Sequence, residues 1–155
     1  MEEPKSSFDS TADTLKHIKT VSTLMSGAAA ELLRRGQIHD QSKLEDPEKA
    51  DFDRMTPILK DLKYGTAEYA ASLKELDKAL QHHYKHNSHH PQFYENGVND
   101  MDLFDLMEMF LDWVAATQRT EGGDILKSIE INKERFGLSD QLAKIMVNTV
   151  ERFTE

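Results

Sequence analysis

Apolar residues recur at helical spacing along most of this chain, and this regularity limits what it can fold into. Between residues 10 and 35 they fall three or four positions apart, as on one face of an amphipathic helix. No segment shows the period-two alternation of a half-buried strand. We therefore predict an all-α fold, a single compact bundle of about six or seven helices. One domain would cover residues 10–155, after a flexible tail at residues 1–9.

Capping residues and helix breakers set the expected boundaries. Thr66 and Ser139 are good N-caps, and Gly36 is expected to stop the first helix. His89-His90-Pro91 is expected to end another helix, because proline cannot continue it. The predicted helices cover residues 10–35, 48–62, 66–87, 101–120, 124–136 and 139–153, with a short turn or helix over 37–44.

Composition restricts the functional classes. The net charge of −9 argues against duplex nucleic acid as a partner, because phosphate binding needs a basic surface. Cysteine is absent, which excludes disulfides and thiolate metal sites. No apolar run approaches the roughly 20 residues of a membrane span, and the acidic N-terminus lacks a signal-peptide core, so we expect a cytoplasmic protein. The oligomeric state is not encoded, and a homo-oligomer stays open.

The histidines are clustered. Five of the seven fall between His82 and His90, and the others are His17 and His39. Neutral imidazole is the commonest metal ligand in proteins, so the cluster suggests a metal site. The alternative is a surface tract that binds metal only loosely. His83 follows Leu80 by three positions and therefore extends the buried face of its helix, which makes it a better ligand candidate than His82.

The segment 101–120 is apolar around most of its circumference, except for a strip with Asp105, Glu108 and Asp112, followed two turns later by Arg119. A helix of this kind is buried, and a buried carboxylate needs a partner. The strip could face water. Alternatively, the histidine cluster supplies the missing partner.

His39 and Asp40 form the third element. Adjacent side chains point in different directions, so one metal takes both only in a tight helical turn. Alternatively, Asp40 bridges two metals while His39 binds one of them. The dipeptide alone is weak evidence. Together with His17, the later histidines and Asp112, it forms the order His, His-Asp, His, His-His, Asp.

This order resembles the HD-domain superfamily of metal-dependent phosphohydrolases, helical proteins whose ligands follow the pattern His…His-Asp…Asp. Residues 39–43, His-Asp-Gln-Ser-Lys, are similar to the HDxxK form of the motif. More narrowly, the chain resembles a bacterial and phage family of HD-like proteins. The motifs that carry this likeness are HDxSK at 39–43, HxxxNxHHPxxY at 83–94 and EMxxDW at 108–113.

The resemblance implies a role for each residue. The first metal would be held by His17, His39, Asp40 and Asp112, and Asp40 would bridge to a second metal held by His83 and one or both of His89 and His90. Substrate contacts would come from Lys43, Lys85, Asn87 and Arg119. Glu108 would orient a ligand imidazole or act as a base. The expected cofactor is one or two divalent transition metal ions (Mn, Fe, Co, Ni or Zn, with Mg as an alternative), since nitrogen-rich ligation favours a transition metal.

The expected function is that of a metal-dependent phosphohydrolase acting on a nucleotide or related small phosphoester. Two alternatives keep the same site. One is an HD-type diiron oxygenase that cleaves C–C or C–P bonds. The other is a non-catalytic protein that binds a nucleotide or partner and uses the metal only as a brace. The identity of the substrate cannot be read from the sequence.

Overall fold

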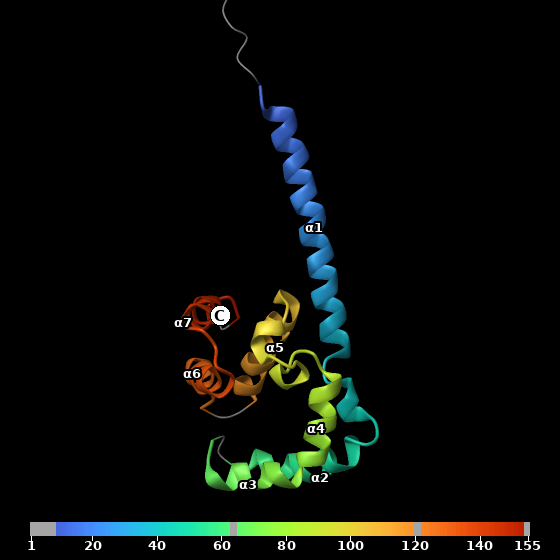
Figure 1. Ribbon diagram of the computed structural model, residues 1–155, viewed down its shortest axis with the longest axis vertical. Coiled ribbons are helices and arrows are strands. Elements are labelled where there is room, and N and C mark those ends of the chain that lie inside the picture. The colour runs from blue at the N-terminus through green and yellow to red at the C-terminus, as the bar shows by residue number, and fades with distance from the viewer. Residues whose placement is uncertain (1–8, 63–64, 120–121, 154–155) are drawn as a thin grey trace, which may run out of the picture. The chain divides into compact units, whose positions relative to one another are not determined.

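The computed structural model describes residues 9–62, 65–119 and 122–153 (Figure 1). These residues contain seven α-helices and no strand, which confirms the predicted all-α fold. Contacts within the chain divide it into two units, Met1–Gln37 and Ile38–Glu155. The single domain that we predict over residues 10–155 therefore stays a prediction. The predicted tail lies almost entirely outside the described residues.

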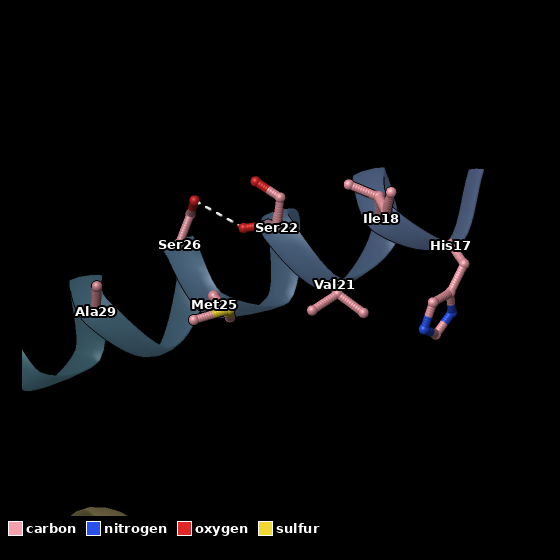
Figure 2. A pocket seen from close by; sticks show the side chains of 7 residues that line it. All are labelled: His17, Ile18, Val21, Ser22, Met25, Ser26 and Ala29. Carbon is pink, nitrogen blue, oxygen red and sulfur yellow. Dashed lines mark hydrogen bonds between the residues drawn. The ribbon is translucent and has the colours of Figure 1, made fainter. Parts of the chain in front are cut away.

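The described part of the first unit is formed by one long helix, α1 (Thr11–Ile38), whose last residue already belongs to the second unit. Asp9 Oδ1 accepts a hydrogen bond from the Thr11 N–H at 2.9 Å, and so satisfies one of the unpaired donors at the start of the helix. Figure 2 shows one face of α1, where the Ser26 hydroxyl donates to the Ser22 carbonyl oxygen at 2.9 Å. The predicted stop at Gly36 is wrong, because the helix continues for two further residues.

The second unit contains six α-helices and three short 3₁₀ helices in its described part. In chain order these are η1 (Gln41–Leu44), α2 (Lys49–Lys60), α3 (Ala67–Glu75), α4 (Asp77–His86), η2 (Pro91–Phe93), η3 (Gly97–Asp100), α5 (Leu103–Gln118), α6 (Ile125–Phe136) and α7 (Asp140–Val150). Both predicted N-caps are confirmed. Thr66 Oγ1 accepts from the Tyr69 N–H, and Ser139 Oγ accepts from the Leu142 N–H.

The predicted continuous helix over residues 66–87 is wrong, because the chain bends at Leu76 between α3 and α4. The Leu76 N–H donates to the Leu73 carbonyl in a tighter turn than that of an α-helix. Its side chain is fully buried in a small cluster with Met55 of α2 and Ala79 of α4. Packing against α2 thus overrides a helical pattern that is continuous in the sequence.

The larger core lies where α5, α6 and α7 meet. Its buried members are Met109, Phe110, Trp113, Val114, Ile125, Ile129, Leu138, Ala143, Met146 and Val150. Because this core fixes the apolar face of α5, the carboxylates Glu108 and Asp112 are left on a different face of that helix. None of the described helices is long and apolar enough to cross a membrane.

The core can be tested with two substitutions on α6. Ile129 is 0% exposed, whereas Leu126 is 49% exposed. We expect Ile129→Ala to lower the free energy of unfolding by about 2–5 kcal/mol, since it leaves a cavity. Leu126→Ala should change it by less than about 1 kcal/mol. Urea denaturation measures both, and equal losses would contradict this placement of the core.

Candidate metal centre

Asp40 occupies an uncommon backbone conformation between α1 and η1. Its φ of 56° and ψ of 18° lie in the left-handed region, and no other non-glycine residue in the described part of the chain has a positive φ. Aspartate tolerates this region better than most residues. The turn brings adjacent side chains together, with His39 Nε2 3.6 Å from Asp40 Oδ2. The turn is left-handed rather than the helical turn that we expected, but it too brings the two side chains close together.

Four ligand atoms converge on one side of Asp40. Asp40 Oδ1 lies 3.1 Å from His83 Nε2 and 3.4 Å from His89 Nε2, and His83 Nε2 lies 2.9 Å from His90 Nε2. His83 belongs to α4, and the other two histidines precede η2. His83 and His89 are 1% and 2% exposed. Asp40, His83, His89 and His90 are referred to below as the four-residue group.

Three ligand atoms converge on the other side. His39 Nε2 lies 3.5 Å from Asp112 Oδ1 of α5, in addition to its approach to Asp40 Oδ2. The side chains of this three-residue group (His39, Asp40, Asp112) are 21–27% exposed, so solvent reaches them. Asp40 therefore contributes one oxygen to each group.

Two buried polar atoms lack the partner that buried polar atoms normally have. Among the described residues, Asp40 Oδ1 and His89 Nε2 are the buried side-chain atoms without a hydrogen bond, and both belong to the four-residue group. Leaving such an atom unpaired costs about 1–3 kcal/mol. A cation between them would satisfy both. Imidazole nitrogens with one carboxylate oxygen form a donor set suited to a divalent transition metal, so the residues fit such an ion.

Glu108 orients a histidine of each group. Its Oε1 lies 2.9 Å from His39 Nδ1 and 3.1 Å from His89 Nδ1. A carboxylate only accepts hydrogen bonds, so it favours the tautomer in which each Nδ1 carries the proton. The Nε2 lone pairs of both rings are then available to a metal. His39, His89 and Glu108 form a third group in the described chain whose atoms lie close enough to hold a metal, and these two hydrogen bonds explain why they lie together.

Sequence reasoning missed Glu48. This carboxylate is 0% exposed and lies 3.0 Å from His83 Nδ1 and 2.7 Å from His82 Nδ1. It follows Pro47 in a charged stretch that resembles a solvated loop, and no sequence signal marks it as buried. Although Glu48 contacts both adjacent histidines, only His83 belongs to the four-residue group, and His82 does not.

Asp105 anchors the loop that carries two of the ligands. This buried carboxylate of α5 accepts hydrogen bonds from Ser88 Oγ at 2.6 Å and from the Tyr94 hydroxyl. Burial, together with the hydrogen bond to Asp105, raises the pKa of Tyr94 to about 12. The two contacts attach the chain on both sides of His89 and His90 to α5. The sequence placed Asp105 on the polar strip of α5 but gave no indication of these partners.

In the metal-free protein, the candidate ligands differ in their protonation at neutral pH. Hydrogen bonds to Asp112 and then to Glu108 raise the pKa of His39 to about 10, so this imidazole is protonated at neutral pH. Burial, with the nearby histidines, lowers the pKa of His90 to about 3, so that ring is neutral. Burial opposes ionisation of Asp40, but adjacent imidazoles and an ammonium group outweigh it and hold its pKa far below the usual range.

The predicted substrate residues are dispersed. Lys43 Nζ pairs with Asp40 Oδ2 at the edge of the centre. Asn87 lies beside the centre, but its amide nitrogen donates to Ser42 Oγ at 2.9 Å and to the His83 carbonyl at 2.8 Å. Two further cations are exposed, Lys85 in the last turn of α4 and Arg119 at the C-cap of α5. Their contacts with a substrate stay predictions.

His17 is the one predicted ligand outside the second unit. It lies on α1, and none of the groups in the described residues that could hold a metal includes it. Its role as a ligand stays a prediction.

The chain belongs to a protein family described as a family of unknown function (DUF5662), which it matches over residues 6–152. No curated protein and no solved structure matches it. The chemistry of the centre must therefore be argued from its own residues.

Metal binding at the three-residue group should release a proton. Because the pKa of His39 is about 10 in the metal-free protein, its proton must leave before Nε2 can bind a metal. Affinity should therefore rise with pH from 7 to 9, by about tenfold per unit for this one group. Isothermal titration with Co²⁺ in buffers of different ionisation enthalpy measures the proton count.

A His39→Ala variant provides the control, because it lacks the proton in question. His90 should contribute none, since its pKa of about 3 leaves it neutral at these pH values. Equal proton release by the wild type and by His39→Ala would contradict the assignment.

Proposed function

We propose that this DUF5662 member is a metal-dependent phosphohydrolase that acts on a nucleotide or related small phosphoester through a dinuclear centre. The observation that carries the proposal is the position of Asp40. One carboxylate oxygen faces the histidines of the four-residue group, and the other faces His39 of the three-residue group. A carboxylate placed in this way can bridge two metal ions.

The residues present would hold the two ions differently. The four-residue group offers three imidazoles and one carboxylate oxygen, almost entirely buried. Within the second unit, the three-residue group offers one imidazole and two carboxylate oxygens, and it is partly exposed. Closed four-ligand sites are typical of tightly held ions, whereas catalytic sites keep a position open. Two bound ions supply Lewis acidity and an activated water at neutral pH.

The chain's own groups would then orient and bind. Glu108 fixes the tautomers of His39 and His89, so both rings present Nε2 to the centre. Lys43 provides a positive charge beside Asp40, suited to a phosphate oxygen. Its ammonium group also lies 5.1 Å from the centre of the Phe52 ring, which limits the positions it can take. Lys43 would thus bind the substrate rather than transfer a proton.

The test is hydrolysis by metal-loaded protein. We expect phosphate release from at least one member of a panel of nucleotides and small phosphomonoesters, and we expect a chelator to abolish it. Asp112→Asn should lower kcat/KM by about 100-fold or more, because it removes a ligand, and loss of residues behind the ligands already costs 10–100-fold. Glu130→Gln, an exposed carboxylate on α6, is the matched control and should leave turnover unchanged.

Other outcomes separate the alternatives. Oxygen consumption by the Fe²⁺-loaded protein, without phosphate release, would indicate an oxygenase that uses the same ligands. Bound metal with no turnover, and a lower melting temperature in His39→Ala, would indicate a brace in a binding protein. Either result would contradict the phosphohydrolase proposal.

A further inference from the structure

Glu48 is a buried carboxylate at the start of α2 that hydrogen-bonds to other elements of the fold. It stands at the N-cap position of α2, but its side chain makes no capping hydrogen bond there. Instead, it accepts a hydrogen bond from Ser42 Oγ of η1 at 2.9 Å, and its two oxygens face the two adjacent histidines of α4. Burying an ionised carboxylate is costly unless it is fully hydrogen-bonded. These three contacts provide that compensation.

The groups around His83 bear on which of its nitrogens carries a proton. Its Nδ1 lies 3.0 Å from Glu48 Oε2, and the Asn87 amide nitrogen lies at the same distance. That amide has other acceptors, the Ser42 hydroxyl and the His83 carbonyl oxygen. With the proton on Nδ1, every donor in the network has an acceptor. Nε2 lies 3.1 Å from Asp40 Oδ1, so each nitrogen of the metal-free ring has a carboxylate acceptor, whereas a metal bound at Nε2 requires the proton to be on Nδ1.

We propose that Glu48 is a positioning residue that holds the His83 ring with Nε2 directed at the four-residue group. Ligand imidazoles commonly donate their second N–H to a carboxylate, which fixes the ring and raises its basicity. Glu48 contacts no histidine of the three-residue group, whereas Glu108 contacts one histidine of each. Loss of Glu48 should therefore weaken only one of the two metal sites. This inference rests on the proposed metal centre.

The test measures each site separately with Co²⁺. An Asp112→Asn background disables the three-residue group and reports on the four-residue group, and a His90→Ala background does the reverse. In the first background we expect Glu48→Gln to raise the Kd for Co²⁺ by about 10-fold and Glu48→Ala by up to about 100-fold. In the second background the Kd should change by less than about threefold. Equilibrium dialysis with metal analysis gives all of these values.

A stability control and a spectroscopic readout accompany these variants. Met55→Ala removes a fully buried side chain from α2 and should lower the melting temperature without weakening Co²⁺ binding. In the wild-type protein loaded with diamagnetic Zn²⁺, long-range ¹H–¹⁵N spectra should show the His83 proton on Nδ1, a measurement that requires no variant to fold.

Equal weakening in both backgrounds, no weakening in the first, or a proton on Nε2 of His83 would overturn the role of Glu48. The proposed function fails differently. If the wild-type protein bound no Co²⁺, both proposals would be overturned. Binding without phosphate release would contradict the phosphohydrolase alone, because none of the measurements on Glu48 depends on turnover.

Discussion

The candidate site depends on the carboxylate of Asp40, because one of its oxygens lies near His83 and His89 and the other lies near His39. Its left-handed backbone conformation is unfavourable for most residues, and such conformations persist only where the surrounding structure stabilises them. Here the surroundings include His83, His89 and Lys43, all close to the carboxylate oxygens. Even so, Oδ1 lacks a hydrogen bond. The local fold thus places a buried negative atom among imidazoles, an arrangement that a cation completes.

Glu108 and Glu48 contact the histidine nitrogens that face away from the proposed metal positions, and these contacts orient the rings. An imidazole can offer either nitrogen, so a histidine cluster alone does not define a site. Glu108 and Glu48 reduce this ambiguity because each lies at the Nδ1 of a different ring, His39 and His83. The same carboxylates add negative charge to a partly desolvated region, and the protonated His39 and the Lys43 ammonium group offset part of it in the metal-free protein. Orientation and charge both support the proposed occupant, a divalent metal ion.

Much of the fold could be predicted from the sequence, because local signals and tertiary contacts agree there. Helical periodicity gave the all-α class, and the caps at Thr66 and Ser139 have local causes. The bend at Leu76 could not be predicted, since it results from packing against α2. For the site, the ordered motifs indicated His39, Asp40 and Asp112, which the structure brings together. Glu48 was missed because the two histidines that it contacts follow it by 34 and 35 residues, on α4.

The central claim is that Asp40 bridges two metal ions, and diffraction from metal-soaked crystals tests it most directly. Anomalous maps from crystals soaked in Co²⁺ should show two peaks per chain, one beside each carboxylate oxygen of Asp40. Histidines 83, 89 and 90 should surround one peak, and His39 and Asp112 the other. A single peak, peaks that Asp40 does not contact, or no peak among these residues would contradict the account.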